Sequence, residues 1–246
     1  MAKRTRPWFY YFANQLFRIL FRLVLKAEVR GVDRVPRDGP LIIAISHSSF
    51  LDPLLAGAYI HRDIIPMAKI EAFSIPFLGG AIKAYGAFPV RRGEVDLNAF
   101  KTALQILRNG GAMVIAPEGH HSETGTLQRG REGAIMLSLR SGAPILPVAV
   151  WGGKSIWKNL PRLKRTPMWF RVGEPVIPAA SMTRPTRAEM AEMGDELMVR
   201  IADMMPPELR GYYADSSHVT SHHLEKYEPE RANIGLPAKQ KEVIAR

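Results

Sequence analysis

Short, continuously apolar runs alternate along the chain with segments whose apolar positions recur at helical spacing. After Pro40 the runs are, in order, LIIAIS, IIPMAK, GAFPV, AMVIAP and PILPVAVW. Helical patterns separate them and begin near Asp52, Asp96 and Glu132. Runs that are apolar throughout are typical of strands buried on both faces, and their alternation with helices indicates a parallel sheet. We therefore expect an α/β fold: one domain with a mostly parallel central sheet flanked by helices.

The C-terminal third predicts one more strand, one long helix and a polar tail. The segment MWFRVGEPV reads as an additional strand near the sheet's edge, interrupted by Gly173 and Pro175. A helix is expected from about Pro185 to Met205, capped by Thr183. Few large apolar residues follow, so we expect residues 215–246 to form a loosely packed polar extension of the domain, which spans 28–214.

The N-terminal segment WFYYFANQLFRILFRLVLK predicts an amphipathic helix within residues 1–27. Because Arg18 and Arg22 interrupt its apolar stretch, it is not expected to span a bilayer. A basic stripe beside aromatic residues suits the plane of a membrane interface, and we expect a peripheral or monotopic position on the cytoplasmic face. The alternative is a helix that packs on the core. The stripe comprises Asn14, Gln15, Arg18, Arg22 and Lys26.

Composition narrows the chemistry. The chain has 246 residues, no cysteine and a formal charge of +11, which favours anionic partners such as nucleic acid, anionic lipid or phosphorylated substrates. The lack of cysteine excludes disulfides, thiolate metal sites and a cysteine nucleophile. His218, His222 and His223 lie close in sequence, but no carboxylate at matching spacing completes a site. We expect surface histidines there and no metal.

A histidine and an aspartate follow the first apolar run, in LIIAISHSSFLDP. Reactive groups of open α/β sheets lie beyond the carboxyl ends of strands, and this turn can bring His47 and Asp52 together. Imidazole can take a proton from an attacking hydroxyl, and a carboxylate on its other nitrogen fixes the tautomer. A structural histidine beside a helix-capping aspartate is the alternative interpretation of this motif alone.

Three further strand ends carry candidate binding residues. Arg91 and Arg92 follow GAFPV, and arginine binds phosphate through two parallel hydrogen bonds. Glu118 and Gly119 follow AMVIAP, where glycine allows close approach of the backbone to a ligand. A solvated basic end and an ordinary acidic turn are the alternatives for these two ends. The fourth run, which contains Pro147, reads by itself as core.

In this order, the segments resemble the glycerolipid acyltransferase family, which includes bacterial 1-acylglycerol-3-phosphate acyltransferase. The resemblance covers roughly residues 25 to 213 and rests on a His-x4-Asp block, a Gly-x-x-Phe-x-x-Arg-like block, a Glu-Gly-x-x-Ser block and a Pro-Ile-x-Pro-Val block. It implies that His47 is the general base and Asp52 its partner. The substrate-binding residues that it implies are Gly86, Phe88, Arg91, Glu118, Gly119, His121 and Pro147.

The resemblance also implies the reaction and its partners. A fatty acyl group would pass from acyl-CoA or acyl-carrier protein to the free hydroxyl of 1-acylglycerol-3-phosphate at a membrane, without a cofactor, metal or nucleic acid. The third block departs from the family, because His120 and His121 stand where Thr-Arg is common. This admits acceptors such as lyso-ornithine lipids or glycolipids, although Arg92, Arg129 and Arg131 could supply the missing charge. An alternative of another class is a non-catalytic module that binds membranes or nucleic acid.

Overall fold

The computed structural model describes residues 6–49, 51–91, 93, 96–120, 122, 124–217, 219 and 222–228. The α-helices in this part are α1 (Trp8–Val24), α2 (Asp52–Tyr59), α3 (Leu78–Tyr85), α4 (Leu97–Arg108), α5 (Gly133–Ser141), α6 (Ile156–Asn159) and α7 (Arg187–Ala202). The strands are β1 (Leu25–Arg30), β2 (Leu41–Ile45), β3 (Ile64–Lys69), β4 (Phe88–Val90), β5 (Ala112–Ile115), β6 (Ile145–Trp151), β7 (Thr166–Val172), β8 (Val176–Pro178) and β9 (Leu224–Lys226).

The strands form one mixed, mostly parallel sheet, as the alternation of apolar runs predicts. Its main order is β1-β7-β6-β2-β5-β3-β4, with β8 and β9 added beside β6. The central neighbours β6, β2, β5, β3 and β4 pair in parallel, whereas β6 pairs with β7 and β8 in antiparallel fashion. The carboxyl ends of β2, β5 and β3 therefore meet at one edge of the sheet.

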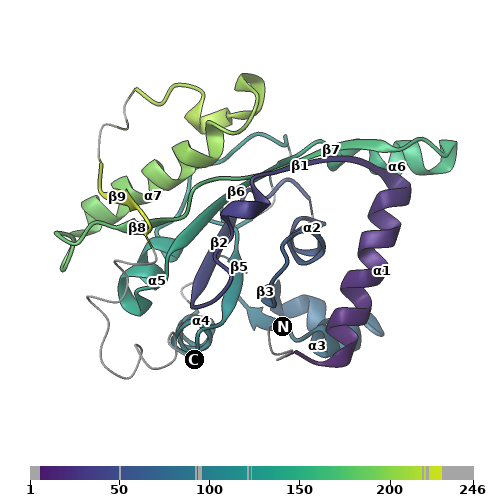
Figure 1. The fold of residues 1–246 in the computed structure, drawn as a ribbon, viewed down its shortest axis with the longest axis horizontal. Coiled ribbons are helices and arrows are strands. Elements are labelled where there is room, and N and C mark those ends of the chain that lie inside the picture. The colour runs from purple at the N-terminus through teal and green to yellow at the C-terminus, as the bar shows by residue number, and fades with distance from the viewer. Residues whose placement is uncertain are drawn as a thin grey trace.

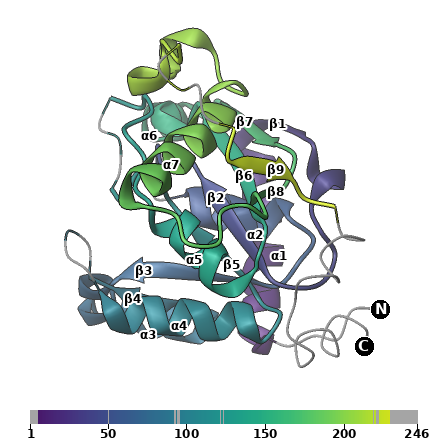
Figure 2. The same cartoon turned by 90° about the vertical axis from the view of Figure 1, so that its left-hand side faces the viewer.

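Helices cover both faces of this sheet (Figure 1). Helices α1 and α2 bury Phe21, Leu55 and Ala56 on one face, against the odd-numbered residues of β2. Helices α4, α5 and α7 pack on the other face, where Ile42 and Ala44 of β2 point. Figure 2 turns this second face toward the viewer, with α7 and α5 in front of the sheet. Because β2 is covered on both sides, all of its residues are buried and the strand reads as a continuous apolar run.

Three elements differ from the sequence-based expectations. The segment after α1 forms β1, which pairs in parallel with β7, so β7 is an interior strand rather than an edge strand. The cap of α7 is Thr186, whose hydroxyl accepts from the backbone of Glu189, and not Thr183. Residues 224–226 of the expected polar extension form β9, which pairs with β8. Residues 229–246 lie outside the described residues.

The N-terminal helix is present, but its polar residues do not all face outward. Asn14 is buried and its side-chain oxygen accepts from the Tyr85 hydroxyl at 2.6 Å. Arg18 donates from Nε to the Ala58 carbonyl of α2 at 2.6 Å. The stripe residues Asn14 and Arg18 thus contact the domain, whereas large apolar side chains of α1 are exposed. In the described part of the chain no helix is long and apolar enough to cross a membrane.

Candidate active site

The turn after β2 brings His47 and Asp52 into contact. The His47 Nδ1 lies 3.2 Å from the Asp52 Oδ2, across five positions of sequence. The same carboxylate oxygen accepts from the backbone N–H of Ser49 at 2.8 Å, and Asp52 is the first residue of α2. These two contacts fix the carboxylate, so it can hold the imidazole in one orientation.

Both side chains are shielded from water. His47 is 4% exposed and Asp52 is fully buried. Burial raises the pKa of the Asp52 carboxyl to about 8, although hydrogen bonds from the backbone of Ser49 and Ser48 act in the opposite direction. A carboxylate that is costly to ionise attracts the proton of its neighbour strongly, so the two groups titrate as one unit.

The Glu118 carboxylate holds the backbone at His47 in place. One carboxylate oxygen accepts from the backbone N–H of His47 at 2.7 Å, and the other accepts from the backbone N–H of Gln128 at 3.0 Å. The His47 carbonyl in turn accepts from the backbone N–H of Ser122 at 3.0 Å. Burial raises the pKa of Glu118, and the His47 and Gln128 amides oppose this shift. The carboxylate therefore ties the end of β2 to the loop after β5.

A cavity of about 240 Å³ opens beside His47 at the carboxyl edge of the sheet. Its walls are apolar on the strand side, where Met67, Val90 and Val114 contribute. Arg91 and Arg131 also line it and are exposed, which places them toward its opening, and no carboxylate is among its lining residues in the described part of the chain. The imidazole thus faces a small cavity that is apolar inside and cationic at its mouth, which suits an anionic headgroup joined to an apolar chain.

The other residues implied by the resemblance lie in different places. Gly119 lines the cavity at φ +80°, and a Cβ there would come within 3.0 Å of the Arg131 side chain. Gly86 is the C-cap of α3, two residues before β4 begins, and Arg6 donates to its carbonyl. Phe88 belongs to the core, and Pro147 lies within β6 opposite Ala44. The binding roles of these residues remain predictions, and His121 is outside the described residues.

Two residues that contribute to the candidate site, Ser49 and Arg131, were not assigned to it from the sequence. Ser49 holds Asp52 through its backbone, and the Ser-x-x-Asp spacing is the signal that could have indicated this turn. Arg131 was expected only as a reserve of positive charge, whereas it lines the cavity. Among the described residues, no group of three or more His, Cys, Asp or Glu converges as metal ligands would. His223 instead approaches Glu192, with 3.1 Å between Nε2 and Oε2.

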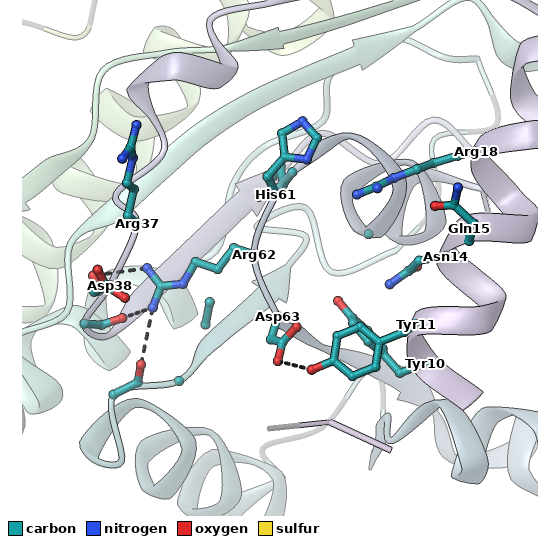
Figure 3. Close-up of a pocket in the computed structure, with 16 residues that line it drawn as sticks. Tyr10, Tyr11, Asn14, Gln15, Arg18, Arg37, Asp38, His61, Arg62 and Asp63 are labelled. Atoms are coloured by element: carbon teal, nitrogen blue, oxygen red, sulfur yellow. Dashed lines mark hydrogen bonds between the residues drawn. The ribbon is translucent and has the colours of Figure 1, made fainter. Parts of the chain in front are cut away.

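A larger cavity, of about 590 Å³, opens at the opposite edge of the sheet, between α1 and the starts of β2 and β5 (Figure 3). It contains His61 and Arg62, but Arg62 donates to the carbonyl oxygens of Pro36, Asp38, Gly39 and Gly110. The Asp63 carboxylate accepts from the Tyr11 hydroxyl at 2.6 Å. No contact between a histidine and a carboxylate is found in this cavity among the described residues, so we assign it no acid–base chemistry.

Comparison with known proteins identifies the family. The family model described as Acyltransferase matches residues 26–151, just over half of the chain. The chain is 30% identical over 197 residues to 1-acyl-sn-glycerol-3-phosphate acyltransferase of Bacillus subtilis, covering 79% of this chain and 96% of that protein. It is 27% identical to the enzyme of the same name from Borreliella burgdorferi, over 55% of this chain and 56% of that protein.

The fold also has a solved counterpart. The crystal structure of the 1-acyl-sn-glycerophosphate acyltransferase from Thermotoga maritima matches with a TM-score of 0.58 and 22% identity, covering 76% of each chain. At this level of identity the likeness concerns the fold, and the family follows from the sequence matches. This protein belongs to the acyltransferase family, and it resembles the enzymes that acylate lysophosphatidic acid.

Proposed function

We propose that this acyltransferase moves a fatty acyl group from a thioester to the free hydroxyl of 1-acylglycerol-3-phosphate, giving phosphatidic acid. The contact between His47 and Asp52, at the floor of a cavity with Arg91 and Arg131 at its mouth, carries the proposal. The names of the similar proteins support the choice of acceptor. The thioester is acyl-CoA or acyl-carrier protein.

In the proposed mechanism His47 is the general base. With Nδ1–H donated to Asp52, the other ring nitrogen, Nε2, accepts the proton of the acceptor hydroxyl. The oxygen attacks the thioester carbonyl carbon, an ester C–O bond forms and the C–S bond breaks. The proton on His47 then passes to the departing thiolate. No covalent enzyme intermediate is needed, because the nucleophile belongs to the acceptor.

The two arginines select the acceptor in this proposal. A phosphate monoester carries up to two negative charges at neutral pH, and arginine donates to it through two parallel N–H groups. Arg91 is on the loop after β4 and Arg131 precedes α5, so they approach the cavity from two elements. The apolar inner wall suits the glycerol carbons or the start of the acyl chain.

The test is an assay of the purified protein with one acyl-CoA and two acceptors, 1-acylglycerol-3-phosphate and a lysolipid without phosphate, such as a lyso-ornithine lipid. We expect a much higher kcat/KM for the phosphate acceptor, and parallel assays with acyl-carrier protein identify the preferred donor. Equal or reversed preference between the acceptors would reject lysophosphatidic acid as the substrate. Absence of thioester turnover with every acceptor would reject the catalytic proposal.

We also propose that α1 lies at the surface of a membrane, on its cytoplasmic face. The exposed apolar side chains recur at steps of three and four, which places them on the helix face opposite the buried Tyr10 and Phe21. An apolar face of this kind, without cover, is typical of an interfacial helix. Its exposed apolar residues are Trp8, Phe12, Leu16, Ile19, Leu20 and Leu23.

Replacing Phe12 and Leu16 with serine should weaken sedimentation with phospholipid vesicles about tenfold or more. The matched control is Met136→Ser, an exposed apolar residue of α5 on the other face of the sheet. Point variants are preferable to deletion of residues 1–27, because such a deletion removes Tyr10 and Phe21 from the core and shortens β1. Unchanged vesicle binding by the double variant would contradict the proposal.

A further inference from the structure

The connection between β6 and β7 ends in a projecting segment, residues 156–164, which we call the 156–164 tip. It comprises α6 and the 3-10 turn Leu160–Arg162. Ile156 anchors the tip in the core, whereas Trp157 is 65% exposed and Leu163 is 95% exposed. Leu160 is also exposed. Three large apolar side chains thus stand in water on one short segment that the catalytic cavity does not use.

The tip has a defined shape. The backbone N–H of Lys164 donates to the Asn159 carbonyl at 3.1 Å, and that of Leu163 donates to the Leu160 carbonyl at 3.1 Å. The Asn159 side chain donates to the Thr166 hydroxyl at 3.0 Å. Leu163 sits at φ +50°, a left-handed conformation that is costly for a leucine. A strained backbone conformation that an ordered segment maintains, and that exposes an apolar side chain to solvent, indicates a binding role.

The charges of the tip are all of one sign. The sequence from 153 to 165, GKSIWKNLPRLKR, contains no aspartate or glutamate. Lys158, Arg162 and Lys164 are exposed and alternate along the chain with the apolar residues. Such a mixture is complementary to a bilayer with anionic headgroups, because apolar side chains can enter the acyl boundary while the cations meet phosphates.

The tip is held next to the membrane-facing helix. Arg165 donates from Nε to the carbonyl of Leu25, the residue that follows α1, at 2.9 Å. At the other end of α1, Arg6 donates to the Tyr85 carbonyl of α3 at 3.0 Å. Figure 1 shows α1 running along one side of the molecule, from α3 to α6. The turn before α3 carries Phe77, a second strained apolar projection, which is 97% exposed at φ +61°.

From these observations we infer that the 156–164 tip is a second membrane contact, which inserts Trp157, Leu160 and Leu163 into an anionic lipid bilayer. The inference rests on the proposed position of α1 at the membrane, and it adds a contact that is separate in sequence. Two contacts at different points fix the tilt of a protein on a bilayer, whereas α1 alone permits rotation about its own axis. The tip thereby sets how the cavity faces the lipid.

The test compares the wild type with Leu160→Ser/Leu163→Ser in sedimentation with two kinds of vesicle. One kind contains equal amounts of phosphatidylcholine and phosphatidylglycerol, and the other contains phosphatidylcholine alone. We expect the double variant to bind the anionic vesicles about tenfold or more weakly. Lys158→Gln/Lys164→Gln should lose binding only to the anionic vesicles, by about fivefold for each lysine.

Two controls keep the outcome interpretable. Leu163→Gly removes the side chain and relieves the positive φ, so it should fold at least as well as the wild type and still bind less. Met136→Ser should bind like the wild type. Turnover of a short-chain, monomeric acceptor should be the same in all these proteins, which separates failure of the tip from failure of the proposed reaction.

Unchanged vesicle binding by both tip variants would overturn the inference, whatever acceptor the enzyme uses. Analytical ultracentrifugation tests the alternative that the tip binds a second copy of this chain. If the wild type self-associates and the double variant is monomeric, while vesicle binding is equal, the tip is an interface between copies of this chain and the membrane assignment is wrong.

Discussion

Two cavities lie at opposite edges of the same sheet, and the smaller one contains the His47–Asp52 pair that we propose as catalytic. The cavity of about 240 Å³ contains His47, which contacts the Asp52 carboxylate. The cavity of about 590 Å³ contains His61, for which no hydrogen bond or ion pair to another described residue is found, and Arg62, which is bound to carbonyl oxygens. Volume therefore does not identify the site. A titratable group becomes a base when a partner fixes its tautomer and its orientation.

The same contrast applies to the cations. Arg62 is tied by the carbonyls of two loops, which holds the starts of β2 and β5 together, and burial lowers its pKa. Arg91 and Arg131 are exposed on the rim of the smaller cavity. An arginine whose donors are occupied by backbone oxygens maintains the fold, whereas one at a cavity mouth is placed to bind an anion.

The largest effect on activity is expected when one of the two histidines is replaced with alanine. His47→Ala should reduce kcat/KM about a thousandfold or more, because it removes the proton acceptor. His61→Ala, the matched control from the larger cavity, should leave kcat/KM and the melting temperature close to those of the wild type. Similar losses in both variants would show that the two edges of the sheet do not differ as proposed.

Asp52→Asn should reduce kcat about a hundredfold or more, by removing the group that orients the imidazole. The base form of the pair has lost one proton, so activity should fall as pH decreases through the apparent pKa of the pair. Burial raises the pKa of Asp52 to about 8, which moves this acidic limb upward in the wild type. Losing the carboxylate should shift the limb to lower pH. A pH profile that is the same in both proteins would argue against a coupled pair.

Arg91→Ala should raise the KM for the phosphate acceptor about tenfold, with little change in kcat, because one charged contact is lost in both the ground and transition states. The acyl-CoA KM is the internal reference and should not move. Arg37→Ala, an exposed arginine at the larger cavity, is the control. A defect of Arg91→Ala confined to kcat would instead place Arg91 near the reacting atoms.

The smallest effect on activity is expected for Arg62→Met. Several carbonyl oxygens would lose a charged donor, so the free energy of unfolding should fall by about 3 kcal/mol. At a temperature where the variant is folded, kcat/KM should equal that of the wild type. Chemical denaturation measures the first quantity and the acyltransferase assay the second. An activity loss in the fully folded variant would give the larger cavity a role in turnover.

Local patterns gave the central sheet and the contact between His47 and Asp52, because both arise from short stretches of chain. Runs that are apolar throughout mark β2, β5 and β6, and one turn of chain joins the two reactive residues. The features that the sequence did not predict depend on contacts between residues that are far apart in the chain. β1 is half polar and forms only because β7 pairs with it. Likewise, the outward and inward faces of α1 follow from Tyr85 and Ala58, which no helical periodicity can indicate.

Helix α2 joins the proposed catalytic pair to α1 over a short distance. Its first residue is Asp52, and near its end the Ala58 carbonyl accepts from Arg18 of α1. Eight helical residues span about 12 Å, so the carboxylate is connected to α1 through a stiff and very short element. Detergents that loosen α1 from α2 would disturb the alignment of the carboxylate without reaching it. Preparations extracted in different detergents should therefore differ in turnover number even when their reactive residues are intact.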